Sequence, residues 1–117
     1  MENKDKLKAV PIVNEKGQPV LPSLDAVIAG TYSPLARPIF IYVNAKSLGK
    51  PEVKEFVQYY MTHGAKLAKE VKYVPLPDSA YRTAWDHVLK GKKGTVFGGT
   101  PEVGITIEEL LRREAKI

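Results

Sequence analysis

The sequence predicts an α/β protein. Ile39–Val43 is a run of β-branched and aromatic residues whose only polar group is that of Tyr42, which is typical of a strand buried on both faces of a sheet. Two amphipathic helices are indicated as well, one starting at Pro51 and one at Asp78, because apolar residues recur there at helical spacing. We therefore expect helices packed on a sheet that contains Ile39–Val43.

The composition narrows the class of protein further. A chain of 117 residues with 44% hydrophobic content is sufficient for one domain with a core. The net charge of +5 falls short of the concentrated basic face of nucleic-acid-binding proteins, so no nucleic-acid partner is expected. The absence of cysteine excludes disulfides and thiolate zinc sites. We also expect neither a signal peptide nor a transmembrane helix in this chain, since no apolar run is long enough.

The first thirty residues predict a strand, a turn and a short helix. Leu7–Val13 is rich in apolar residues and is expected to be a strand, and Asn14–Gly17 is expected to be the turn after it. Ser23 can cap a helix over Leu24–Ala29 through its hydroxyl, and Gly30 stands where a left-handed residue would end that helix.

The approach to the central strand contains two prolines. Pro34 and Pro38 each fix their own φ and disfavour helix in the residue before them, which predicts a stiff, extended approach. Arg37 lies between them and could pair with a carboxylate or reach an anion, and we expect a structural ion pair.

The helix beginning at Pro51 has the clearest periodicity in the chain. Its apolar face comprises Val53, Phe56, Val57, Tyr60 and Met61. We expect His63–Gly64 to interrupt it and Leu67–Val71 to form a second short helix. Tyr73–Pro77 contains two prolines and is expected to be extended.

The next helix is predicted to be capped by Asp78 and to stop at Gly91, with Trp85 in the core. Its apolar face comprises Tyr81, Ala84, Trp85, Val88 and Leu89. A glycine-rich connection follows, and a capping box of Thr106 and Glu109 predicts a terminal helix.

No residue pattern indicates catalysis. His63 and His87 fall on different helices, and neither has a second ligand at i+3 or i+4, so no metal site is expected and His63 is interpreted as a helix-terminal residue. No serine lies in a nucleophile elbow, and Ser23 and Ser79 are explained by helix starts. The glycine-rich stretch matches neither phosphate-binding glycine motif and is interpreted as a surface connection. We expect no cofactor and no enzymatic activity.

Four long blocks resemble the C-terminal part of the substrate-binding protein of phosphate ABC transporters, in its longer-tailed subgroup. They occur in the order and spacing of that family and comprise residues 30–44, 51–60, 70–81 and 94–109. One departure is Lys72, where the family often has glycine after a helix, and a left-handed turn there would strain lysine modestly.

The resemblance implies part of a two-lobed, type II periplasmic-binding-protein fold. Residues 1–30 would belong to one lobe, 31–44 would be the hinge crossover, 45–90 a helical pair, and 91–117 a glycine-rich tail with a terminal helix. The residues expected to act as hinge or scaffold, and not as ligands, are Tyr32, Pro34, Arg37, Pro38 and Tyr42.

The same resemblance implies inorganic phosphate as ligand, ABC transporter permease subunits as partners, and a periplasmic or cell-surface location. The family's phosphate-binding motifs lie upstream of the matched blocks and none occurs here, so no ligand-binding residue is assigned. The chain is therefore expected to be a fragment that contributes hinge and lobe scaffold and needs the missing N-terminal portion. The alternative is an association module that self-assembles through uncovered apolar helix faces and binds no anion.

Overall fold

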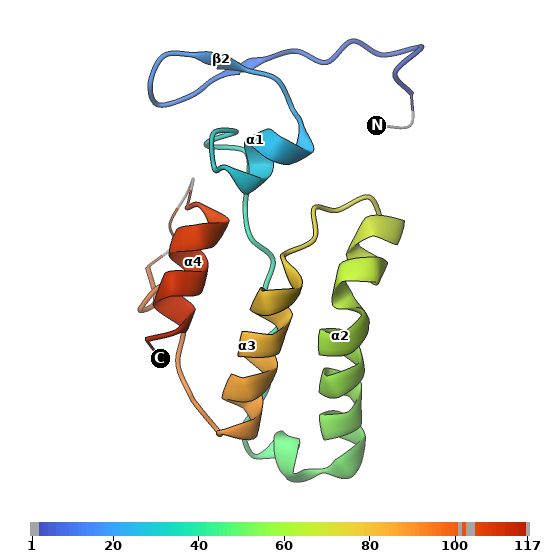
Figure 1. The fold of residues 1–117 in the computed structure, drawn as a ribbon, viewed down its shortest axis with the longest axis vertical. Helices are drawn as coiled ribbons and strands as arrows, with labels where there is room; N and C mark the ends of the chain where they lie inside the picture. Colours follow the sequence, from blue (N-terminus) through green and yellow to red (C-terminus); the bar gives the residue numbers. More distant parts are fainter. Residues whose placement is uncertain (1–2, 101, 103–104, 117) are drawn as a thin grey trace.

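Two antiparallel helices form the centre of the molecule. The structure is a computed structural model, and it describes residues 3–100, 102 and 105–116. The helices α2 (Pro51–Glu70) and α3 (Asp78–Leu89) lie side by side, and α4 (Ile107–Glu114) packs on the other flank of α3 (Figure 1). A single 3-10 turn, η1 (Ser47–Gly49), leads into α2. Three helices thus form one layer.

A small hairpin and a short helix occupy the far end of the long axis (Figure 1). Strands β1 (Ile12–Val13) and β2 (Pro19–Val20) pair antiparallel, with Ile12 opposite Val20. The predicted strand over residues 7–13 is thus confirmed only at its end. Pro11 has no N–H to donate, which explains why the ladder does not extend toward the N-terminus.

The turn inside the hairpin and the helix after the hairpin both agree with the prediction. Gly17 has a positive φ of 74°, as the turn requires. Helix α1 (Leu24–Ile28) is capped by the Ser23 hydroxyl, which accepts a hydrogen bond from the Ala26 N–H at 3.1 Å. Gly30, at φ 69°, ends it.

The prediction of a buried strand over residues 39–43 is wrong. The segment has no regular secondary structure and is not part of a sheet, and the exposed fractions are 68% for Ile39 and 85% for Tyr42. The physical reason is the lack of a neighbour: the sheet found in the described part of the chain is the hairpin at the other end. Residues 31–46 instead descend behind α3 as a connection from α1 to η1 (Figure 1).

The predicted interruption of the second helix at His63–Gly64 is also wrong, because α2 continues without a break to Glu70. Gly64 is buried, and a Cβ built on it would lie 2.7 Å from Cε1 of Tyr81 on α3. The glycine is therefore a point of close approach between two helices and not a helix stop. Helix α2 ends before Lys72, whose φ of 62° is the left-handed conformation anticipated there.

Helix α3 begins one position earlier than the cap assignment implied. Asp78 is its first residue and Pro77 precedes it, while Gly91 has the positive φ of 64° expected after the C-terminus. Residues 73–77 connect the two helices and have no regular secondary structure. Trp85 is half-buried, so its assignment to the core is wrong.

The cap of α4 is confirmed on its threonine side. The Thr106 hydroxyl accepts a hydrogen bond from the Glu109 N–H at 3.2 Å. The Glu109 carboxylate accepts hydrogen bonds from Arg112 and Arg113. The helix thus starts with one half of the predicted capping box.

The core is small for a chain of this length. Among the described residues the buried apolar side chains are Val57, Ala80 and Leu110, one from each helix of the layer. The radius of gyration is 16.4 Å, against about 13 Å for a compact domain of this size. The architecture is mixed, with helices and one two-stranded sheet, and is compatible with part of an α/β protein.

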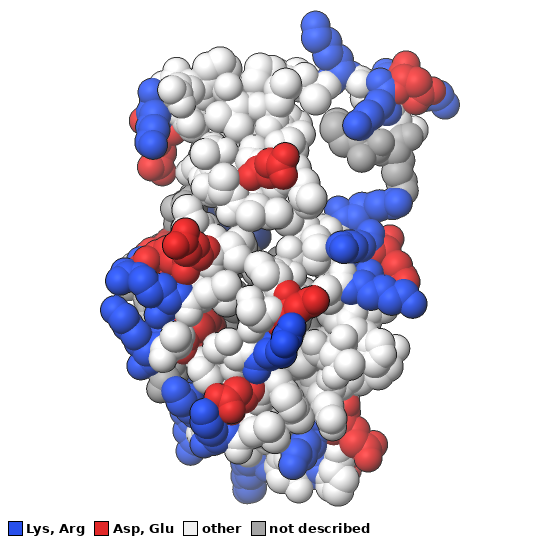
Figure 2. All heavy atoms as spheres, in the orientation of Figure 1, with Lys and Arg blue, Asp and Glu red and all other residues white. Residues whose placement is uncertain are grey.

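Much apolar surface is consequently left uncovered. Figure 2 shows a largely uncharged face over the hairpin and α1, whereas charged side chains gather over the helical layer. Large apolar residues exposed at that end include Leu7, Val10, Val13, Leu21 and Leu24. Exposed apolar patches of this kind occur where proteins contact other proteins, membranes or ligands.

Candidate functional site

The predicted hinge residues are spread along one connection and do not converge on a common point. Tyr32 and Pro38 are half-buried, whereas Pro34, Arg37 and Tyr42 are exposed. The approach is not uniformly extended as predicted, because the chain turns over residues 33–35 and the Ala36 N–H bonds to the Tyr32 carbonyl at 3.0 Å.

The first contact that fixes this connection is one that the sequence did not indicate. Ser33 is buried, at 5% exposure, and its hydroxyl lies 3.3 Å from Oε1 of Glu15 in the hairpin turn. The expected ion pair of Arg37 is wrong for this structure, since Arg37 has no carboxylate within ion-pair distance in the part of the chain described. An exposed cation of this kind remains open to a partner.

A second contact holds the lower half of the connection. The rings of Phe40 and Phe97 pack edge to face with centroids 5.4 Å apart. The described part of the glycine-rich stretch therefore lies against residues 40–43, which agrees with its interpretation as a surface connection. Together with α3 these segments line a groove of about 310 Å³.

His87 and Glu114 meet at the edge of this groove and connect α3 with α4. His87 Nδ1 lies 3.1 Å from Glu114 Oε2, and both side chains are largely shielded from solvent. His63, interpreted as helix-terminal, instead lies within α2 and stacks on the Tyr59 ring at 4.2 Å between centroids. Among the described residues no group of three or more histidine, aspartate or glutamate side chains could hold a metal ion.

The strongest electrostatic interactions lie on α4. Hydrogen bonds from Arg112 and Arg113 lower the pKa of Glu109 from 4.5 to about 2. Hydrogen bonds to Glu102 and Glu109 in turn raise the pKa of Arg113. These groups are paired with one another at distances of 2.6 to 2.9 Å, so they stabilise the terminal helix and are not arranged around a ligand.

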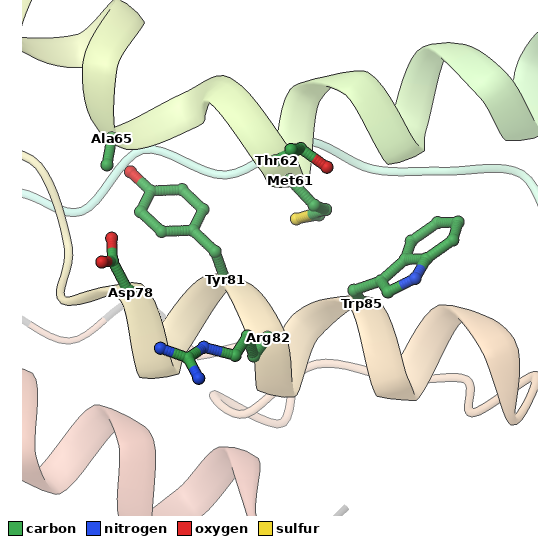
Figure 3. A pocket seen from close by; sticks show the side chains of 7 residues that line it. All are labelled: Met61, Thr62, Ala65, Asp78, Tyr81, Arg82 and Trp85. Carbon is green, nitrogen blue, oxygen red and sulfur yellow. The ribbon is translucent and has the colours of Figure 1, made fainter.

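A second, open pocket lies between α2 and α3. Its volume is about 340 Å³, and it is open to solvent (Figure 3). From α2 it is lined by Met61, Thr62 and Ala65. From α3 it is lined by Asp78, Tyr81, Arg82 and Trp85. Figure 3 shows the Tyr81 ring between the two helices, with Asp78 and Arg82 toward one end of the pocket and Trp85 toward the other.

The spacing of apolar and charged residues in the sequence is a pattern from which this pocket could have been predicted. Met61 and Ala65 are four residues apart on α2, and Asp78, Arg82 and Trp85 follow one face of α3 at intervals of four and three. Two such faces meet wherever adjacent helices pack. What the sequence could not provide was the pairing of α2 with α3 through Gly64.

Comparison with known proteins identifies the family. Protein SphX of Synechococcus elongatus is 49% identical over 113 residues, which is 97% of this chain and 34% of the relative. Protein SphX of Synechocystis is 46% identical over 93% of the chain, and the phosphate-binding protein PstS of Staphylococcus aureus is 38% identical over 74% of it. The chain belongs to the SphX and PstS family. The resemblance to a C-terminal segment of phosphate-binding proteins is thereby confirmed.

The match has a defined extent. The chain spans about a third of the length of the SphX relatives and about a quarter of PstS. No family model and no solved structure matches the chain. In the part of the chain that is described, no helix is long and apolar enough to cross a membrane.

Proposed function

We propose that the chain is the C-terminal scaffold of a phosphate-binding protein that serves an ABC-type uptake system. The observation that carries the proposal is the similarity to relatives about three times as long, which covers 97% of the chain for SphX and 74% of it for PstS, a protein named for phosphate binding. In this proposal inorganic phosphate is the ligand of the complete protein, permease subunits are its partners, and its place is the periplasm or the cell surface. The chain catalyses no reaction.

The exposed apolar surface supports the scaffold role. The three buried apolar residues found in the described part of the chain leave the hairpin end and residues 39–42 uncovered. Burying apolar surface is favourable by about 25 cal/mol per Å², so these regions are suited to packing against the remaining two thirds of the family's length. Residues 39–43 have no regular secondary structure in this chain, and a neighbouring strand from the rest of the protein would supply the hydrogen bonds that the predicted hinge strand lacks.

The hinge residues have distinct parts in this proposal. Tyr32 and Pro38, which are half-buried, would fix the connection on one lobe, with Pro34 shaping the turn before it. Arg37 and Tyr42 are exposed and would contact the other lobe. Because phosphate-binding motifs are absent from the chain, the scaffold is expected to position the lobes and not to bind the anion.

A thermal melt of the purified chain with phosphate and with sulfate tests this division of roles. A ligand present at 100 times its dissociation constant stabilises the native state by about 2.7 kcal/mol. We expect no shift of the melting midpoint with either anion. A midpoint that rises with phosphate but not with sulfate would show that the chain has its own anion site, and the scaffold proposal would then be wrong.

A second candidate function is association between copies of the chain. It is favoured by the outer face of α2, where Phe56 and Tyr59 are 66% and 56% exposed. Sedimentation velocity over a dilution series separates the two candidates. A scaffold that packs only against the rest of its own protein should sediment as a monomer when dilute. An association module should remain a defined oligomer on dilution, and Phe56→Ser should abolish that oligomer.

A further inference from the structure

The pocket between α2 and α3 combines an apolar floor with two opposite charges. Met61, Ala65 and Trp85 are half-buried and form the apolar part, and Figure 3 shows the Tyr81 ring lying between the two helices beside them. Asp78 and Arg82 are exposed at one side of the pocket. A volume of about 340 Å³ is sufficient for a small organic molecule.

The side chains of Asp78 and Arg82 do not neutralise each other in an ion pair. Asp78 and Arg82 are one turn apart on α3, yet no ion pair joins them within the described residues. Asp86 and Lys90, at the same spacing on the same helix, are 2.6 Å apart, and their hydrogen bond lowers the pKa of Asp86. The pocket therefore presents a free carboxylate and a free guanidinium next to an apolar surface.

We propose that this pocket binds a free amino acid with an apolar side chain. The guanidinium of Arg82 can donate two parallel hydrogen bonds to a carboxylate, and the carboxylate of Asp78 can accept from an ammonium group. The side chain of the ligand then covers Met61 and Trp85, where apolar contact is favourable. Inorganic phosphate is a poor fit, because Asp78 repels a dianion and the apolar floor has no counterpart on it.

The affinity follows from the exposure of the charged groups. Exposed ion pairs contribute little to affinity, so a ligand of about ten heavy atoms gains most of its binding free energy from apolar contact. A dissociation constant in the millimolar range, about 1 mM, is therefore expected. This is weak enough to require a reporter located in the pocket itself.

Trp85 is that reporter, since it is the chain's one tryptophan. Its fluorescence should change saturably on titration with L-methionine, which does not absorb at the excitation wavelength. Methionine amide lacks the carboxylate and N-acetylmethionine lacks the ammonium group, so both should bind more weakly. Inorganic phosphate should leave the signal unchanged.

Substitutions identify the groups that recognise the ligand. Arg82→Gln and Asp78→Asn remove exposed charges, so circular dichroism should be unaffected while methionine binding weakens about fivefold for Arg82→Gln. Lys90→Gln on the same helix is the matched control and should bind like the unmodified chain. The proposal is overturned if L-methionine gives no saturable signal, if methionine amide binds equally well, or if Arg82→Gln has no effect.

Discussion

Gly64 is the position where one added carbon atom tests the helix packing most sharply. A Cβ at this position would lie 2.7 Å from Cε1 of Tyr81, and ordinary contacts begin at 3.4 Å. The Tyr81 ring would have to move by about 0.7 Å, and overpacking of this kind costs about 1 to 3 kcal/mol. Alanine is about 1 kcal/mol more favourable than glycine in a helix interior, which offsets part of this cost. We expect Gly64→Ala to destabilise the chain by about 1 kcal/mol.

The sign of this effect depends on the tyrosine ring. In a Tyr81→Leu background the shorter side chain leaves room for the Cβ, so only the propensity gain remains and Gly64→Ala should stabilise by about 1 kcal/mol. The interaction energy in the double-mutant cycle is then about 2 kcal/mol. Gly49→Ala is the matched control, because nothing lies within 4 Å of its Cβ, and it should change stability by less than about 0.5 kcal/mol.

Urea unfolding followed by helical circular dichroism measures all four variants of the cycle. In thermal scans the expected loss corresponds to a midpoint lowered by about 4 °C. If Gly64→Ala stabilises the unmodified chain, or if its effect is the same with leucine at position 81, then α2 and α3 do not approach each other at Gly64 and the packing described here is incorrect.

Three further predictions concern the periphery. Because the pKa of Glu109 in the folded state is lowered to about 2, the contribution of its carboxylate to stability is present above about pH 4.5 and is lost as the pH falls toward 2. Glu109→Gln should therefore lose less helicity than the unmodified chain over that pH range. Identical acid transitions of the two proteins would contradict this. Phe97→Ala removes the edge-to-face contact with Phe40, which is worth about 1 kcal/mol. The variant should be cleaved faster by trypsin after Lys92 and Lys93, which lie in the same glycine-rich stretch. An unchanged cleavage rate would count against the contact. Arg37→Ala should alter the stability of the isolated chain by less than about 0.5 kcal/mol, and a loss above about 1 kcal/mol would reveal a partner within the chain.

The helices show what local patterns can and cannot predict. The start of α2 at Pro51 and the stop of α3 at Gly91 were predicted, because both depend on backbone preferences of single residues. Gly64 was misread as a breaker for the same reason. Its role lies in a contact with Tyr81 from another helix, and propensity contains no information about that contact.

The segment 39–43 fails for a different reason. Its composition is that of a buried strand, but a strand exists only when a neighbour supplies hydrogen bonds, and the described chain offers none at that place. The assignment of Trp85 to the core is wrong for a similar reason, since the apolar helix face on which Trp85 lies is covered only in part. Both the segment and Trp85 are less covered in this chain than their composition predicts, and the chain spans about a third of the length of its SphX relatives.

The most direct test of the central claim is a chimera. In PstS of Staphylococcus aureus, the segment aligned with this chain is replaced by the chain itself, and phosphate binding is measured by titration calorimetry beside unmodified PstS. If the chain is a scaffold, the chimera folds and binds phosphate with an affinity close to that of PstS, while the isolated chain releases no heat with phosphate. A folded chimera that binds no phosphate would contradict the account.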